Sequence, residues 1–300
     1  MTTTESDQVA LRLAATVMLV RDSDAGLEVF MVRRNPESAF VGGAYVFPGG
    51  AVDDHDRLDD DIDDVTSGLT DVEASTRLGV DSGGLAHWVA AVRECFEEAG
   101  LLLAYGADGE IVRLDDPAVQ RRFARHRADV DAGRVRLVEI CELEGLTLAC
   151  DAIHYFAHWI TPVGPPRRFD TRFFVARTPE AQVGAHDERE TVANLWVRPA
   201  DALARREAGE LEMILPTVRN LEAIARFDDV DSLMAAAGAQ AEVPTVVPRL
   251  VQEDGGVRIL LPGDPGYDNT DGLDTPLASG TRLPGQDGGD VQGTSDGGNA

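Results

Sequence analysis

The chain has 300 residues, 43% of them hydrophobic and 27% charged, which is enough for one large domain or two modest ones with a substantial core. Aspartate and glutamate number 53 against 27 lysines and arginines, so the formal net charge is −26. A chain this acidic lacks the positive field that draws proteins to nucleic acids or anionic membranes. The composition therefore predicts neither a nucleic-acid polymer nor a membrane as partner. A phosphate-bearing ligand would need local arginines or a bound cation.

The cysteines and the N-terminal residues indicate the compartment. Cys95, Cys141 and Cys150 show no CxxC or metal-ligand spacing, and their odd number argues against a disulfide framework. Residues 1–10 are polar and lack the basic start of a signal peptide. No apolar run approaches the roughly 20 residues that span a bilayer. We expect a cytoplasmic chain.

The first fifty residues predict a hairpin and a third strand. Residues 11–20 and 27–34 are rich in apolar and β-branched side chains, and a polar turn with Gly26 separates them. Residues 44–47 form another short apolar run, which Pro48, Gly49 and Gly50 would stop.

An acidic segment and then a helix follow. Residues 53–64 hold eight aspartates, so we expect 53–84 to be a solvated insertion with one helical turn over 72–78. From Leu85 to Ala99 apolar residues recur at helical spacing within one arc of about 100°. Gly100 stands where a helix C-cap would lie.

The second half of the chain alternates helical and strand-like patterns before its composition changes. We expect helices over 117–131, 199–208 and 215–226, strand-like runs within 146–175 and a strand over 194–197. Residues 262–300 contain ten glycines, seven aspartates and one arginine, so they cannot bury enough apolar surface to order themselves. The expected organisation is a flexible N-terminus (1–10), a main domain (11–230), an extension (231–261) and a disordered tail (262–300).

Three carboxylates lie opposite the apolar stripe of the 85–99 helix. At 100° per residue, Glu94, Glu97 and Glu98 all point the same way and repel one another. Oxygen ligands at this density suit a hard divalent cation such as Mg²⁺ or Mn²⁺, and Arg93 could pair with one of the carboxylates. The alternative is a solvated acidic face, which the helix composition alone favours.

A wider pattern favours the cation site. Residues 93–101, RECFEEAGL, resemble the second half of the Nudix box, R-E-U-x-E-E-x-G-U, and residues 47–50, FPGG, resemble its opening turn. The spacing departs from the box, because about 29 extra residues separate Gly50 from Arg93. The box's first glutamate falls on Asp56 when counted forward and on Leu85 when counted backward, so its role stays open. Cys95 replaces the expected aliphatic residue.

The interrupted box resembles the Nudix branch of coenzyme A diphosphatases, as do residues 30–50 and 159–174. This resemblance implies an α/β fold, a Nudix-type α/β/α sandwich with a mixed β-sheet. It also implies metal-dependent cleavage of coenzyme A or acyl-CoA to 3′,5′-ADP and (acyl-)phosphopantetheine. Other nucleoside diphosphate derivatives stay open as substrates: ADP-ribose, a nucleotide sugar or a dinucleoside polyphosphate. A non-catalytic metabolite sensor is the remaining alternative, and a homodimer is among the assemblies left open.

The resemblance also implies functional residues. Glu94, Glu97 and Glu98 would hold Mg²⁺ or Mn²⁺ beside Arg93. Glu190, six residues before Trp196, would be a further catalytic carboxylate, with Glu188 as its rival. The general base stays open between Glu94, Glu98 and Glu190.

Substrate contacts rest on arginines and glycines near the box. The expected substrate-binding residues are Arg33, Arg34, Gly49, Gly50, Arg168 and Arg172. The alternative for the arginines is that they are strand-end residues paired with the abundant acids. His154 and His158 lie in an aromatic, strand-like run, which favours core or edge histidines over metal ligands.

Overall fold

A mixed eight-stranded sheet forms the centre of the computed structural model, which describes residues 9–38, 41–57, 65–184, 191–253, 256–269 and 272. Its main order is β10-β7-β8-β1-β2-β3, while β4 pairs with β1 and β9 pairs with β2. β1 runs parallel to β8 and antiparallel to β2. The strands are β1 (Leu11–Ser23), β2 (Gly26–Arg34), β3 (Tyr45–Val46), β4 (Gly49–Ala51), β7 (Ile153–Ile160), β8 (Arg168–Arg177), β9 (Thr191–Val197) and β10 (Thr245–Val246).

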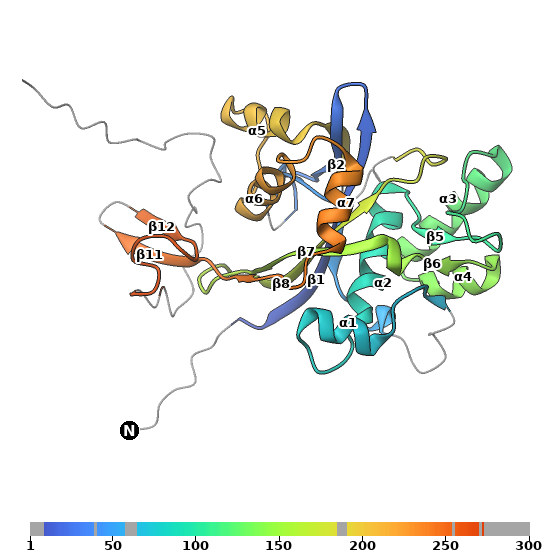
Figure 1. Ribbon diagram of the computed structural model, residues 1–300, viewed down its shortest axis with the longest axis horizontal. Helices are drawn as coiled ribbons and strands as arrows, with labels where there is room; N and C mark the ends of the chain where they lie inside the picture. The colour runs from blue at the N-terminus through green and yellow to red at the C-terminus, as the bar shows by residue number, and fades with distance from the viewer. Residues whose placement is uncertain are drawn as a thin grey trace, which may run out of the picture.

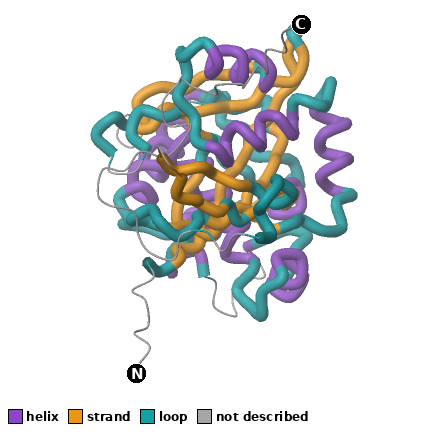
Figure 2. The backbone as a smooth tube through the Cα atoms, turned by 90° about the vertical axis from the view of Figure 1, so that its left-hand side faces the viewer, coloured by secondary structure: helices purple, strands orange, loops and turns teal. Residues whose placement is uncertain are grey.

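Helices cover both faces of the sheet, as the two perpendicular views show (Figures 1 and 2). One face packs against α1 (Asp71–Leu78), α2 (Leu85–Glu94), α3 (Pro117–Asp131) and α4 (Leu137–Glu144), and the other against α5 (Pro199–Glu207), α6 (Leu215–Ile224) and α7 (Val230–Gly238). Side chains of a strand alternate between faces, so β1 sends Val17 and Leu19 into the first core and Met18 and Val20 into the second. The expected sandwich is confirmed.

Two small ribbons lie beside this sandwich. β5 (Ala104–Tyr105) pairs with β6 (Thr147–Leu148) near α3 and α4. β11 (Arg249–Glu253) and β12 (Gly256–Leu260) form a hairpin beyond the ends of β7 and β8 (Figure 1).

The predicted β1–β2 hairpin is confirmed, but the chain after β3 differs from expectation. Gly49 does not stop a strand: it opens β4, which pairs with β1. A Cβ at Gly49 would lie 2.5 Å from the Ala15 carbonyl oxygen, so glycine is needed to bring this backbone against β1. β4 therefore leads the chain directly past the last turn of α2.

The predicted helix over 85–99 begins and ends where expected, yet its last turn is a π-helix, Cys95–Ala99. Gly100 caps it in the left-handed region at φ 67°. A π-turn makes i→i+5 bonds, so positions calculated at 100° per residue do not hold over this turn. All ten residues of α2 are buried, including Glu94 opposite the apolar stripe, so the alternative of a solvated acidic face does not hold for Glu94.

The acidic insertion is less solvated than its aspartates suggest. Asp56, in the 3₁₀ turn Asp54–Asp56, is 1% exposed. Val65, Leu69 and Ala74 join the core beneath α2. The expectation of a solvated segment is wrong for these residues, because local composition does not reveal a long-range partner. Residues 58–64 lie outside the described residues.

The C-terminal part adds elements that the sequence did not predict. α7 packs over β7 and β8, and β10 joins the sheet edge. Tyr267 donates from its hydroxyl to the Val247 carbonyl oxygen, and the Arg249 guanidinium lies over its ring. The expected disorder is therefore wrong for 262–269, while most of 270–300 lies outside the described residues. No helix among the described residues is long and apolar enough to cross a membrane.

Candidate active site

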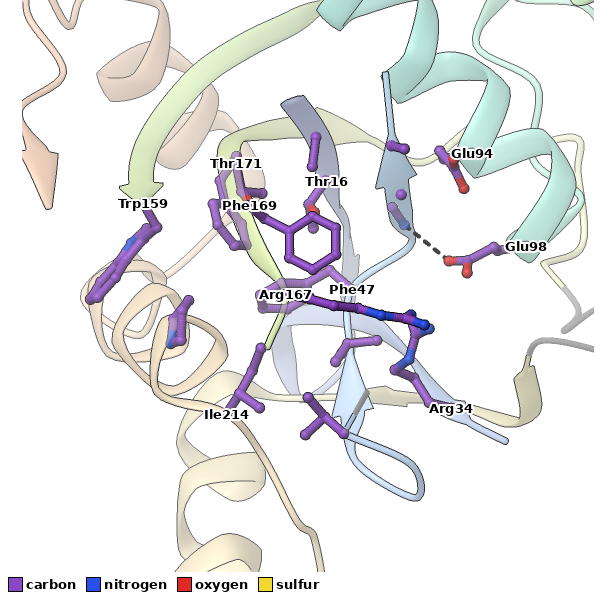
Figure 3. A pocket seen from close by; sticks show the side chains of 18 of the residues that line it. Thr16, Arg34, Phe47, Glu94, Glu98, Trp159, Arg167, Phe169, Thr171 and Ile214 are labelled. Carbon is purple, nitrogen blue, oxygen red and sulfur yellow. Dashed lines mark hydrogen bonds between the residues drawn. The ribbon is translucent and has the colours of Figure 1, made fainter. Parts of the chain in front are cut away.

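A cavity of about 1170 Å³ opens beside β4 and the end of α2. Its wall combines three kinds of side chain: carboxylates from the last turns of the helix, arginines from the end of β2 and from the residues just before α4 and β8, and aromatic or aliphatic residues from β7, β8 and the start of α6. Figure 3 shows Glu94 and Glu98 on one side of it, Arg34 and Arg167 below them, and Trp159, Phe169 and Ile214 farther away.

Arg93 is the centre of the acidic end and is 8% exposed. Its Nε and Nη2 donate to the two oxygens of Asp56 at 2.8 and 3.0 Å, and Nη2 also donates to the Ala51 carbonyl at 2.8 Å. Its Nη1 donates to Glu94 and to Glu97, both at 2.9 Å. These five contacts match the five N–H donors of a guanidinium, so Arg93 is fully hydrogen-bonded.

The glycines of the FPGG turn let the backbone approach these carboxylates. The Gly49 amide donates to Glu98 Oε2 at 2.9 Å (Figure 3). A Cβ at Gly50 would lie 2.3 Å from Glu94 Oε1, so any larger residue would displace that carboxylate. The structure thus brings Gly49 and Gly50 to Glu98 and Glu94 of the helix across the whole insertion.

Burial dominates the electrostatics of this end. It raises the pKa of Glu94 well above its usual value, despite the opposing Arg93 charge. Burial likewise raises the pKa of Glu97 to about 7. Burial acts to lower the pKa of Arg93, but Glu94 and Asp56 outweigh it and the net pKa is raised. The carboxylates of Asp56, Glu94 and Glu97 share the Arg93 guanidinium, and the Glu98 carboxylate acts on Glu94 beside them, so the acidic groups outnumber the one guanidinium.

These residues fit a divalent cation by their chemistry. Carboxylate oxygens are the ligands that Mg²⁺ and Mn²⁺ prefer, and a cation would balance the excess charge. In the described part of the chain, however, no three His, Cys, Asp or Glu side chains form a group able to hold a metal ion. Arg93 holds Glu94 and Glu97, while the Gly49 amide holds Glu98.

Asp56 is a site residue to which sequence reasoning gave no role. Its bidentate contact with Arg93 spans 37 positions of the chain. Counting forward from Gly50 had marked it as the counterpart of the first box glutamate, and counting backward had marked Leu85, a buried residue at the start of α2. The forward count identifies the residue that contacts Arg93, because the extra residues lie after Asp56.

Some of the arginines near the cavity line it, and others lie on the opposite face of their strand. Arg34 and Arg167 line the cavity, and neither has an ion-pair partner among the described residues; Arg34 Nε is buried without a hydrogen-bond partner. The cavity-facing residues of β8 are Phe169, Thr171 and Phe173. Successive side chains of a strand point to opposite faces, so two of the expected arginines, Arg168 and Arg172, lie on the other face.

The remaining expected residues are placed as follows. Arg168 donates to the Thr161 carbonyl, and Arg172 is buried beside Asp170 and His158. Arg33 donates to the Gly43 carbonyl and does not line the cavity. Glu190 and Glu188 lie outside the described residues. The structure therefore brings together Arg93, the three helix glutamates, the two glycines and Arg34, and adds Asp56 and Arg167.

Comparisons with known proteins find a family model and several similar proteins. A family model described as "NUDT19 Nudix domain" matches residues 73–224, just over half of the chain. The chain is 28% identical to the human protein named acyl-coenzyme A diphosphatase NUDT19, over 81% of this chain and 72% of that protein. Its identity to the Xenopus laevis protein of the same name is 23%, over 82% and 73%. The crystal structure of a Nudix hydrolase from Alicyclobacillus acidocaldarius is similar with a TM-score of 0.63 and 26% identity, covering 79% of this chain and 99% of that one.

Proposed function

This chain belongs to the Nudix hydrolase family, and we propose that it cleaves the diphosphate linkage of coenzyme A or acyl-CoA with Mg²⁺ or Mn²⁺. The products would be 3′,5′-ADP and (acyl-)phosphopantetheine. One observation carries the proposal: one end of a single cavity is lined by the buried Glu94 and Glu98 and the part-buried Glu97, and near them by Arg34 and Arg167, which have no ion-pair partner among the described residues. The names of the human and Xenopus relatives support the coenzyme A class of substrate.

The two kinds of charge have different tasks in this proposal. Glu94, Glu97 and Glu98 would hold the cation, which when bound neutralises charge on the bridging phosphates and lowers the pKa of the attacking water. Arg34 and Arg167 would grip phosphate oxygens, since a guanidinium can make two parallel hydrogen bonds to a phosphate. Arg93 would keep two of the carboxylates in place through its five hydrogen bonds.

The proton from the attacking water needs an acceptor in the cavity. Glu94 and Glu98 both line it, and Glu190 stays a third candidate outside the described residues. A carboxylate that serves as base must lie within hydrogen-bond reach of the water. We leave the assignment open among these three.

A substrate panel tests the proposal. The protein is incubated with coenzyme A, octanoyl-CoA, ADP-ribose, a nucleotide sugar and a dinucleoside polyphosphate, each with Mg²⁺, Mn²⁺ or EDTA, and the products are separated chromatographically. Release of 3′,5′-ADP that EDTA abolishes supports it. If the protein releases AMP from ADP-ribose faster than it cleaves coenzyme A, its preferred substrate belongs to another class. Tight binding without hydrolysis would favour the metabolite sensor.

Two neighbouring arginines give the panel a matched pair. Arg167 lines the cavity, whereas Arg168 points to the opposite face of β8. We expect Arg167→Ala to raise KM about tenfold, which corresponds to losing one charged hydrogen-bond pair, and Arg168→Ala to change it little. Equal effects of the two substitutions would contradict the assignment of Arg167 as a phosphate contact.

A further inference from the structure

The cavity extends well beyond the charged residues. Its far end is apolar, with Trp159, Phe169 and Ile214 on the sandwich side (Figure 3). Pro248, Leu250 and Ile259, from the β11–β12 hairpin and the residue before it, line the same cavity. Leu250 and Ile259 are paired across the hairpin, so their side chains lie on one face of it. The charged end and the apolar end are thus one continuous space.

Specific contacts fasten the hairpin to the rest of the molecule. Immediately before it, β10 pairs with the edge strand β7, and the Thr245 hydroxyl lies 2.8 Å from His158 Nδ1. After it, Tyr267 donates to the Val247 carbonyl at 2.8 Å, and the Arg249 guanidinium stacks on the Tyr267 ring. The segment before the hairpin is therefore anchored to the sheet, and the contacts of Tyr267 tie the segment after the hairpin to the residues at its start.

The hairpin also lies outside the part of the chain that the family model matches, which ends at residue 224. The glutamates and Arg93 lie within that match. The apolar wall is therefore contributed by a segment beyond the residues that the family model matches.

We infer that the β11–β12 hairpin forms a binding subsite for an apolar acyl chain carried by the substrate, with Ile259 as its specificity-determining residue. The inference rests on the proposed function, because it assumes that the substrate's diphosphate lies at the glutamates. A substrate with an acyl arm then places that arm along the apolar wall and removes its methylene groups from water, which favours binding. Free coenzyme A lacks that contribution.

Equilibrium binding separates this inference from catalysis. The dissociation constants of octanoyl-CoA and coenzyme A are measured in EDTA for the full-length protein and for three variants. Ile259→Trp fills the apolar end, Ile259→Ser removes apolar surface without adding volume, and Arg258→Trp adds the same ring on the opposite face of β12, where Arg258 pairs with Val251. Thermal unfolding of each variant verifies that it is folded.

We expect the wild-type chain to bind octanoyl-CoA at least tenfold more tightly than coenzyme A. Both Ile259 variants should reduce that ratio about tenfold, while Arg258→Trp keeps it. Equal affinities in the wild-type chain, or an unchanged ratio in the folded Ile259 variants, would overturn the inference. Tighter binding of octanoyl-CoA than of coenzyme A, together with no hydrolysis in Mg²⁺ or Mn²⁺, would support the subsite. It would reject only the proposed diphosphatase activity.

Discussion

Two buried ionic clusters lie against α2, one at its last turn and one beside His87 in its first turn, and they differ in charge balance. The Arg93 cluster consists of Arg93, Asp56, Glu94, Glu97 and Glu98 and opens into the cavity. The Arg172 cluster consists of Arg172, Asp170 and His158, with His87 nearby, and lies on the other face of β8. The Arg93 cluster has four carboxylates and one guanidinium. The Arg172 cluster has one carboxylate and one guanidinium.

The difference in charge balance indicates that the Arg93 cluster serves function and the Arg172 cluster serves stability. In the Arg172 cluster, burial acts to raise the pKa of Asp170, but His158 and Arg172 outweigh it and the pKa lies below its usual value. In the Arg93 cluster, burial raises the pKa of Glu94 and Glu97. Perturbed carboxylates in a cavity are candidates for catalysis, while a balanced buried pair serves the fold. Substituting one member of each cluster should therefore have opposite consequences.

The largest effect is expected from the glutamates. Glu97→Gln or Glu98→Gln should lower kcat about a thousandfold or more, because each removes an oxygen anion from the proposed cation site. Unfolding should be unaffected or shift to higher temperature, since a buried negative charge is lost from a cluster with negative excess. Turnover and thermal unfolding are measured on the same preparations. Near-normal turnover by both variants would sink the assignment.

The Arg172 cluster should respond in the reverse way. Asp170→Ala leaves a buried guanidinium without its carboxylate. It should reduce the free energy of unfolding by about 3 kcal/mol, with kcat/KM per folded molecule within about twofold of the wild-type value.

Asp56→Asn in the Arg93 cluster leaves Arg93 its two glutamates. It should lower the free energy of unfolding by about 1 kcal/mol but lower kcat about tenfold. Urea unfolding and steady-state kinetics compare the two. A kcat loss in Asp170→Ala that exceeds its unfolded fraction would contradict this division.

A smaller effect is expected where α3 supports the Arg93 cluster. Arg127 Nε donates to the Glu97 carbonyl in the π-turn at 2.8 Å. Arg127→Ala should lower kcat about tenfold with KM nearly unchanged, because it loosens the turn that carries Glu97 and Glu98 without touching the phosphate contacts. Arg127→Lys should restore part of kcat. Arg125→Ala, on the exposed side of the same helix, is the matched control, and an equal loss there would argue against a positioning role.

The sequence predicts the sandwich and the acidic end better than it predicts the walls around them. Strand and helix periodicity places β1, β2, α2 and α3, because their apolar faces are continuous. The eight-residue α4 was missed because Val138 and Ile140 favour a strand, although its ends carry helix signals: Glu139 accepts from the Arg136 amide, and Gly145 ends the helix in the left-handed region. The motif identifies Glu94, Glu97 and Glu98, but no local pattern reveals that Asp56 contacts Arg93.

The alternation of side chains between the two faces of a strand explains why the cavity-lining arginines were harder to predict than the glutamates. Arg167 and Arg168 are neighbours in a basic run, so composition treats them alike. Arg168 begins β8 and Arg167 immediately precedes it, so the register of β8 against β1 decides which side of the sheet Arg168 faces, and a shift of one residue would exchange the faces of the strand. That register depends on pairing between strands about 157 positions apart, which the local sequence does not contain.

The smallest effect concerns His87, beside Arg172. Neither of its ring nitrogens has a hydrogen-bond partner in the described structure, and burial together with the Arg172 charge lowers its pKa to about 4. Between pH 6.5 and 4 the unfolded chain binds a proton that the native chain does not, so stability falls as the pH falls through this range. His87→Phe removes this term. At pH 7 its stability should be close to that of the wild-type chain, and at pH 5.5 it should exceed it by on the order of 1 kcal/mol. Urea unfolding at both pH values measures the difference. Equal acid destabilisation of the two chains would mean that His87 is protonated in the native state, and the Arg172 cluster would then carry an extra positive charge and lose its balance.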